Sequence, residues 1–266
     1  MLNNITLGQY FPGTSLLHRL DPRTKLLCTL LFIVGIFLAQ TPLAYGVLCA
    51  FTLLVIVLGR LPLILVLKSI KPIWIILVLT LCIHALSAQG DTILYQYSFF
   101  TVTQEGLEQG IKMCLRLVLL LFFSSVLTLT TSPIVLTDGI ESLLRPFKCV
   151  GLPAHELAMM MTIALRFIPT LLEETDRIMK AQTARGADFE DGNMLVKAKN
   201  MLPLLIPLFV SSFRRADELA IAMEARCYRG GEGRTRMHQL HYGSRDMLAF
   251  VGIFALLAVL AILRFR

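Results

Sequence analysis

The feature that most constrains this chain is a set of uncharged apolar runs of near-membrane length. With its flanks, each run approaches the roughly 20 residues that a helix needs to cross a bilayer core about 30 Å thick. Only 16% of the residues are charged, whereas a soluble domain carries about 25%. The sequence therefore predicts an all-α, polytopic membrane protein with about five transmembrane helices. The runs occupy residues 26–39, 43–59, 72–89, 117–132 and 247–263.

The basic residues predict the orientation, because Lys and Arg are retained on the cytoplasmic side of a membrane. Segment 133–246 holds fifteen of the 25 Lys and Arg, whereas the connections 40–42 and 90–110 hold none. We expect a cytoplasmic N-terminus and a C-terminus on the opposite side. We interpret the net charge of +7 as the result of basic residues that set the membrane topology and contact anionic lipid headgroups, and not as a sign of nucleic-acid binding.

The chain divides into three predicted regions. Residues 1–132 form an N-terminal membrane region with four transmembrane helices, residues 133–246 form a cytoplasmic or interfacial region of coupling helices, and residues 247–266 form a C-terminal transmembrane helix. In the middle region we expect two long helices, at about 153–185 and 202–226. Both are apolar at their start and amphipathic toward their end, which favours a helix lying against the membrane face over a further membrane span.

The two long helices end in matching sequences 41 positions apart. In each, two alanines and the arginine share a face, because their spacings are three and four. Small alanines allow another surface to approach, and arginine offers five donors in a planar fork. An arginine near a helix C-terminus also has a plain structural explanation, compensation of the helix dipole. The duplication favours paired attachment points for a two-fold partner, at Ala184-Arg185-Gly186 and Ala225-Arg226-Cys227.

A methionine cluster lies near the start of the first long helix. Flexible thioethers let one surface repack against several partners. Packing against neighbouring helices or lipid is the structural alternative. We expect this surface to contact a membrane partner through Met159, Met160, Met161 and Leu165.

Enzymatic chemistry is not indicated. The glycine-rich segment 229–234 is followed by no Gly-Lys-Ser/Thr, so it is no phosphate-binding loop, and the chain is not expected to hydrolyse ATP. No Asp or Glu lies in the middle of a predicted span, which argues against a proton-driven carrier and against an intramembrane aspartyl protease. The six cysteines include no C-x-x-C pair, so no metal site is expected. The interpretation is a non-catalytic chain that binds no cofactor itself.

Three motifs in this order resemble the transmembrane T component of energy-coupling-factor (ECF) transporters. The first is Tyr10-x-Pro12-Gly13-x-Ser15-x-Leu17-His18-Arg19-Leu20-Asp21-Pro22-Arg23-Thr24-Lys25-Leu26, in which Asp21 can cap the first span and Pro22 fits its first turn. The others are the two Ala-Arg sequences. Cys227 departs from the resemblance, because the second motif usually has Gly there. We expect a residue other than Gly to stiffen that helix end.

The resemblance implies a division of labour in the plasma membrane of a prokaryote. Two cytoplasmic ATP-binding subunits would use ATP and magnesium, a separate membrane S component would bind the substrate, and this chain would join them. Arg185 and Arg226 would dock into grooves on the two ATPases, with Ala184, Gly186 and Ala225 as closely packed neighbours. The resemblance favours vitamins as substrates. The alternatives are a cobalt or nickel T component and a membrane scaffold that binds a non-transport partner.

Overall fold

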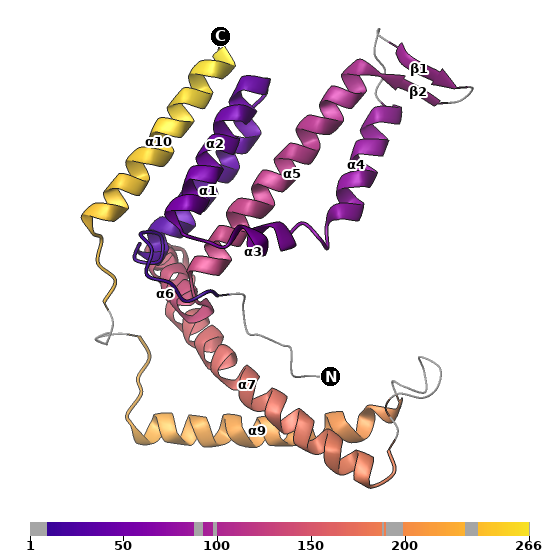
Figure 1. The fold of residues 1–266 in the computed structure, drawn as a ribbon. Helices are drawn as coiled ribbons and strands as arrows, with labels where there is room; N and C mark the ends of the chain where they lie inside the picture. Colours follow the sequence, from indigo (N-terminus) through magenta and orange to yellow (C-terminus); the bar gives the residue numbers. More distant parts are fainter. Residues whose placement is uncertain are drawn as a thin grey trace. The chain divides into compact units, whose positions relative to one another are not determined.

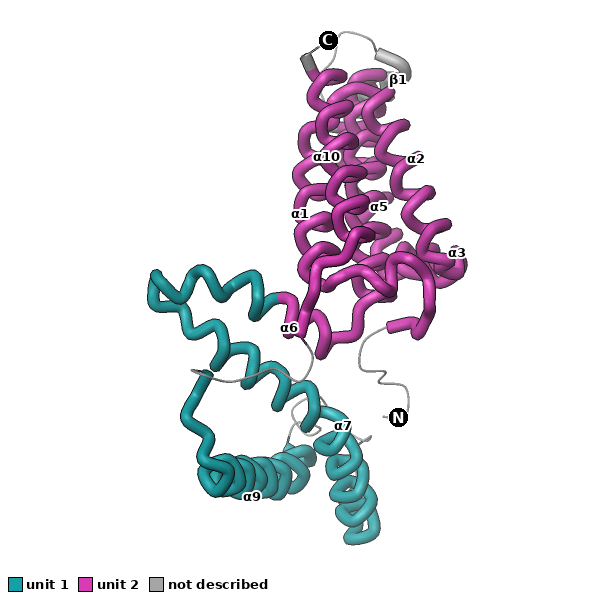
Figure 2. Tube along the Cα trace, turned by 90° about the vertical axis from the view of Figure 1, so that its left-hand side faces the viewer, with its two compact units in different colours: residues 1–7, 140–238 teal, residues 8–139, 239–266 magenta. Residues whose placement is uncertain are grey.

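A computed structural model describes residues 10–87, 93–97, 100–187, 189, 199–231 and 239–265. Helices dominate it, so the predicted all-α membrane fold is confirmed (Figure 1). The chain separates into two compact units (Figure 2). The described parts of 8–139 and 239–266 form a helical bundle, and those of 140–238 form the second unit. The three-region division predicted from the sequence stays a prediction.

Five helices of the bundle coincide with the five apolar runs. They are α1 (Pro22–Leu38), α2 (Pro42–Leu58), α4 (Trp74–Ser87), α5 (Gln104–Thr130) and α10 (Ser244–Phe265). A short helix, α3 (Leu63–Lys68), follows α2. Strands β1 (Ile93–Tyr97) and β2 (Phe100–Thr103) form a small antiparallel hairpin, which the sequence did not predict. Helix α6 (Pro133–Leu144) follows α5 and leads into the second unit.

The helix starts have the polar caps that orphan N–H groups require. The Asp21 carboxylate accepts a hydrogen bond from the Arg23 N–H at 2.9 Å, and Pro22 occupies the first turn of α1, so both predictions for this end are confirmed. The Thr41 hydroxyl caps α2 through the Ala44 N–H. Thr103 caps α5 in the same way. Because Thr103 sets this start, α5 begins well before the apolar run at 117.

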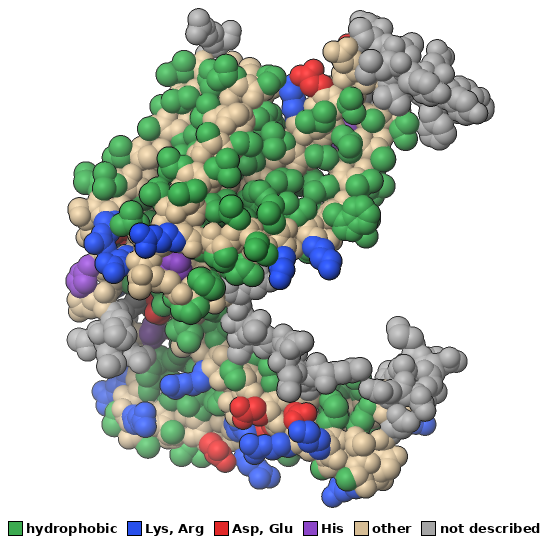
Figure 3. All heavy atoms as spheres, in the orientation of Figure 1, with side chains coloured by type: hydrophobic (Ala, Val, Ile, Leu, Met, Phe, Trp, Pro, Cys, Tyr) green, Lys and Arg blue, Asp and Glu red, His purple; other side chains and the backbone are tan. Residues whose placement is uncertain are grey.

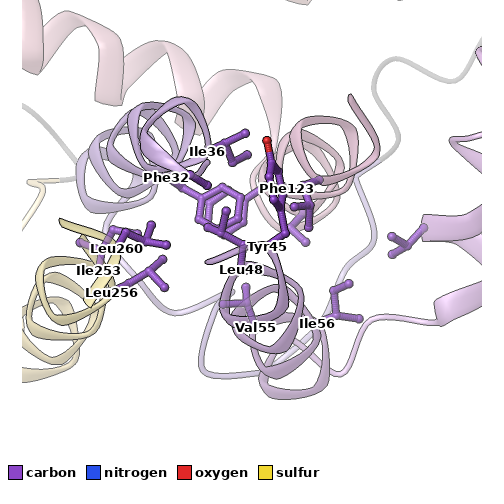
Figure 4. Close-up of a cluster of buried hydrophobic side chains, with 14 of the residues drawn as sticks. Phe32, Ile36, Tyr45, Leu48, Val55, Ile56, Phe123, Ile253, Leu256 and Leu260 are labelled. Atoms are coloured by element: carbon purple, nitrogen blue, oxygen red, sulfur yellow. The ribbon is translucent and has the colours of Figure 1, made fainter. Parts of the chain in front are cut away.

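The core of the bundle is an apolar cluster between α1, α2, α5 and α10 (Figure 4). Phe32 is fully buried and stacks on Phe123, with their ring centroids 3.9 Å apart. Leu48 from α2 and Ile253 from α10 close the cluster on its other sides. Burying a side chain of this size stabilises a fold by about 1.5–3 kcal/mol. This cluster therefore holds together helices that are far apart in the sequence.

A buried polar junction joins the start of α1 to the start of α10 and the end of α5. Asp246, only 4% exposed, accepts the Asp21 N–H at 2.9 Å and the Gly243 N–H at 2.8 Å. The Lys25 ammonium donates to the Thr130 carbonyl at 3.0 Å and to the Thr131 hydroxyl at 3.2 Å. The α1 and α10 starts and the α5 end therefore lie at one end of the bundle.

The outer surface of the bundle is apolar, as a bilayer requires. Figure 3 shows hydrophobic side chains covering its helices, with Lys and Arg gathered mainly at one end. Exposed residues include Val57 at 70% and Leu248 at 72%. Soluble proteins rarely expose apolar surface on this scale. By length and composition, α5, α10 and α7 (Ala154–Ala184) could each cross a membrane, and α2 and α4 are shorter apolar helices. For α7, both the interfacial interpretation and the spanning alternative remain open.

The second unit contains two long helices. A 3-10 turn, η1 (Arg145–Val150), leads into α7, and α9 (Leu202–Ala225) follows later in the chain. Their bounds agree with the predicted ranges 153–185 and 202–226. Pro169 and Pro207 lie inside α7 and α9, and neither interrupts its helix. Proline inside a helix usually bends or interrupts it, and the interruption is absent here.

Candidate functional site: two matching helix ends

Helices α7 and α9 cross where Glu174 meets two residues of α9. The Ser211 hydroxyl donates to Glu174 Oε1 at 2.5 Å, and the Arg215 guanidinium pairs with Glu174 Oε2. The side chains of Glu174 and Arg215 are 21% and 31% exposed, so the pair is partly shielded from water. This contact fixes the two helices to each other at one point along their length.

The two helices extend equally far beyond the crossing point. Glu174 and Arg215 are 41 positions apart, the same offset that separates Arg185 from Arg226. Each arginine therefore lies the same distance along the chain beyond the crossing. With a rise of 1.5 Å per residue, each arm is roughly 16 Å long. The repeat found in the sequence thus corresponds to two equal arms that extend from one contact.

Both arms end in the same backbone turn. At the end of α7, the Ala187 N–H bonds the Gln182 carbonyl and the Gly186 N–H bonds the Thr183 carbonyl. At the end of α9, Tyr228 and Cys227 make the equivalent bonds to Met223 and Glu224, at 3.0 and 2.8 Å. This pair of bonds defines a Schellman cap, which requires a left-handed residue just past the helix.

The left-handed position is occupied by different residues in the two caps. Gly186 has φ +89° and Cys227 has φ +55°. Gly186 occupies this position as glycine commonly does, because it has no Cβ to strain. Cys227 adopts the same left-handed conformation without the freedom that glycine has, and for a residue with a Cβ this costs about 1–2 kcal/mol. The loss of Gly therefore leaves the shape of the second cap unchanged and introduces strain there.

We expect substitutions at the left-handed positions of the two caps to have opposite effects on the stability of the helix ends. Cys227→Gly should stabilise the α9 end by about 1 kcal/mol, because it relieves the left-handed strain, and Gly186→Ala should destabilise the α7 end by about as much. Hydrogen exchange of the last turn of each helix measures both. A Cys227→Gly protein with unchanged protection in that turn, compared with Cys227→Ala as the control, would contradict the assignment of strain.

The two arginines at the caps are open to solvent. Arg185 and Arg226 are exposed, as are Ala184 and Ala225. Neither guanidinium has a hydrogen bond or ion pair within the described part of the chain. Both sites therefore present a cation beside a small residue, the arrangement that the sequence predicted. The basic, glycine-rich segment 229–234 that continues from the second cap lies partly outside the described residues.

The starts of the two helices present an unpaired apolar surface. Met160 and Met161 are 55% and 45% exposed, whereas Met159 and Leu165 are half-buried. On α9, Ile206 and Phe209 are each 61% exposed. An apolar groove of about 310 Å³ lies in the angle between the helices, lined by residues such as Phe167, Leu171, Leu219 and Met223. Surfaces of this kind mark sites that contact a membrane or another protein.

One contact at the second cap was not foreseen from the sequence. The Tyr228 hydroxyl lies 3.3 Å from His155 Nε2, and His155 Nδ1 lies 3.1 Å from the Glu141 carboxylate. The end of α9 is thereby connected to the start of α7 and to α6. These three residues are 14 and 73 positions apart along the chain, so no local motif could have revealed the contact.

The contact between Glu174 and Arg215 is expected to stabilise the protein more than a surface ion pair does. A double-mutant cycle over Glu174→Ala and Arg215→Ala is expected to give a coupling energy of about 1–2 kcal/mol in thermal unfolding, since the pair is partly shielded and multiply hydrogen-bonded. The solvent-exposed pair Asp176–Lys180 provides a control on the same helix. Its cycle should give no more than about 0.5 kcal/mol. Equal values for the two pairs would show that the crossing contributes no more than a surface ion pair.

Sequence comparison relates this chain to known transport proteins. A family model described as CbiQ, cobalt transport protein, matches residues 13–238. The energy-coupling factor transporter transmembrane protein EcfT of Acidaminococcus fermentans is 66% identical over 264 residues, covering 99% of this chain and 98% of that protein. The proteins of the same name from Brevibacillus brevis and Bacillus subtilis are 54% and 50% identical, covering 99% of this chain and 97% and 100% of those proteins.

The fold, the apolar surface and these relatives define a multi-pass membrane component of a transporter. The chain belongs to the EcfT family, the transmembrane proteins of energy-coupling factor transporters. This confirms the resemblance found in the three sequence motifs.

Proposed function

We propose that this chain couples ATP hydrolysis in two cytoplasmic subunits to substrate movement by a separate membrane S component. The observation that carries the proposal is the pair of equal arms, each ending in the same cap with an exposed arginine. Two identical attachment points suit a dimeric partner, because a two-fold partner offers the same surface twice. Arg185 and Arg226 each anchor one ATPase subunit, with Ala184, Gly186, Ala225 and Cys227 allowing close approach.

The crossing contact supports a mechanical role. When ATP draws the two subunits together, both arms are displaced, and the contact of Glu174 with Ser211 and Arg215 makes the helices move as a pair. In each helix the apolar start lies across the crossing from that helix's own cap, and the α9 cap lies beside the start of α7, where the Tyr228 hydroxyl meets His155. Motion at the caps is therefore transmitted to the surface that contains Met159, Met160, Met161 and Leu165, where the S component binds. Exposed methionines permit this surface to accept S components of differing sequence.

The same proposal covers location and chemistry. The protein lies in the plasma membrane of a prokaryote with its N-terminus and the α7–α9 region in the cytoplasm, since most Lys and Arg lie in those segments. The chain is non-catalytic and binds no cofactor, while ATP and magnesium are used by the partner subunits. The substrate is set by the S component. We propose vitamins, and because the matching family model is described as a cobalt transport protein, cobalt is the second candidate.

Reconstitution tests the proposal. The chain is co-expressed with an ATPase pair and one S component from the same genome, and the purified complex is placed in liposomes. ATP-dependent uptake of the cognate vitamin, absent when the chain is omitted, is the expected result. Cobalt is assayed with a cobalt-type S component in parallel. A chain that retains neither the ATPases nor the S component would overturn the proposal and favour a scaffold for a non-transport partner.

A further inference from the structure

A second feature, separate from the matching helix ends, is a cavity in the helical bundle. It lies where α1 and α10 begin and where α2 and α5 end, and its volume is about 330 Å³. That volume is at the lower end of the range for small-molecule sites. Apolar side chains from all four helices and from the segment before α1 line it, including Leu17, Phe51, Val126 and Ile253.

The cavity is an elongated slot with apolar walls. On α10 its lining runs from Arg245 to Ile253, eight helical steps, which corresponds to roughly 12 Å along the helix. Phe123 and Ile253 at the deep end are buried, whereas Leu16, Leu54 and Leu248 are more than half exposed. The cavity thus reaches the apolar outer surface of the bundle. A helix with side chains is about 10–12 Å in diameter, so a segment of the same length would need a volume several times larger than 330 Å³, whereas a single hydrocarbon chain suits the slot.

Polar groups lie at one end of the slot. Thr24 is fully buried and lines it, and the Thr24 hydroxyl has no hydrogen-bond partner within the described residues. Lys25 also lines the cavity, but its ammonium already donates to protein oxygens. Arg245 is exposed at the same end and, among the described residues, has no ion pair. The cavity therefore combines an apolar interior with one available cation at its entrance.

We propose that this cavity binds one acyl chain of an anionic phospholipid, whose phosphate lies against the Arg245 guanidinium. Phospholipid is the hydrocarbon-chain ligand that surrounds a membrane protein, and the exposed rim opens the slot to it. Basic residues at the membrane surface attract anionic lipids by about 1 kcal/mol each. A zwitterionic lipid offers the same chains but carries a compensating positive charge, so Arg245 selects the anionic headgroup.

Filling the cavity with a larger side chain tests whether it binds an acyl chain. Gly252 lines the cavity, and a Cβ built on it meets no atom within 4 Å, so Gly252→Leu is expected to start a side chain at the slot without a backbone clash. Gly46 on α2 is equally open and does not line the cavity, so Gly46→Leu is the matched control. The full-length protein is reconstituted in phosphatidylcholine nanodiscs containing a phosphatidylglycerol with a photoreactive acyl terminus. Crosslinked residues are identified by mass spectrometry.

We expect crosslinks to cavity residues such as Cys28 and Phe51, at least fivefold reduced in Gly252→Leu and unchanged in Gly46→Leu. Gly252→Ala, which adds less volume, should give an intermediate reduction and keeps the test decisive if Gly252→Leu fails to fold. Crosslinking that Gly252→Leu and Gly252→Ala leave unchanged overturns the site.

Competition tests the headgroup. Unlabelled phosphatidylglycerol should displace the probe at least threefold better than phosphatidylcholine, and Arg245→Gln should abolish this difference without loss of fold, since Arg245 is exposed. Equal competition by the two lipids in the wild-type protein overturns the selection of an anionic lipid. Stronger competition by oleic acid than by phosphatidylglycerol would overturn the phospholipid and identify a free fatty acid as the ligand.

Discussion

The Arg185→Ala, Arg226→Ala protein is expected to lose both ATPase subunits during purification. Truncating a charged anchor at an interface costs about 2–5 kcal/mol, and 1.4 kcal/mol corresponds to a tenfold change in affinity. Each substitution should therefore weaken binding roughly thirty-fold or more, and the two together should abolish stable assembly. Co-purification from detergent, followed by ATP hydrolysis of the eluted complex, measures the loss. The single variants should each retain a weakened complex.

The control for this experiment removes the same charge from the same helices. Arg177 on α7 and Arg214 on α9 are exposed but lie away from the caps. The Arg177→Ala, Arg214→Ala protein should retain the ATPases in normal yield. If both double variants retained them equally, the caps would be ordinary helix ends and the arginines would serve only the helix dipole. If both lost them, a general electrostatic attraction would explain binding better than two defined anchors.

Replacing Asp246 with alanine is expected to destabilise the helical bundle by about 2–4 kcal/mol. The carboxylate is buried and accepts the N–H groups of Asp21 and Gly243. Removing it leaves two donors without acceptors and takes a negative charge away from the neighbourhood of the Lys25 ammonium. Unfolding in detergent, followed by circular dichroism or by a thiol-reactive dye, should show a marked drop in the transition midpoint.

Two further variants separate the causes of that loss. Asp246→Asn keeps a carbonyl acceptor and removes the charge, so an intermediate effect is expected. Asp217→Ala removes an exposed acidic residue of α9 and should change the free energy of unfolding by less than about 0.5 kcal/mol. An Asp246→Ala protein as stable as the Asp217→Ala protein would show that the junction between α1 and α10 adds nothing to stability.

Local sequence patterns were sufficient to predict the long helices. The apolar runs coincide with α1, α2, α4, α5 and α10, because membrane-length hydrophobicity is a property of consecutive residues. Asp21 was recognisable as a cap for the same reason, since capping depends on residues within one turn. Helix α5 begins at Gln104, thirteen positions before the apolar run at 117, because the polar Thr103 provides its cap.

Contacts between distant residues could not be predicted in this way. Asp21 and Asp246 are 225 positions apart, and nothing in the composition of either segment indicates that they meet. The contact between Glu174 and Arg215 has the offset of the repeat, yet the repeat alone does not say that the helices cross there. Cys227 shows the complementary case: the missing glycine was visible in the sequence, but only the backbone angle shows that cysteine adopts the left-handed conformation.

The apolar starts of α7 and α9 also bear on how a cell can produce this protein. A newly made chain that presents Met160, Ile206 and Phe209 to its surroundings offers the kind of surface that chaperones and quality-control proteases recognise. Copies made in excess of any partner that covers this surface should be degraded or should aggregate. Synthesis matched to that partner, for instance from one messenger RNA, would then set the cellular abundance of the chain.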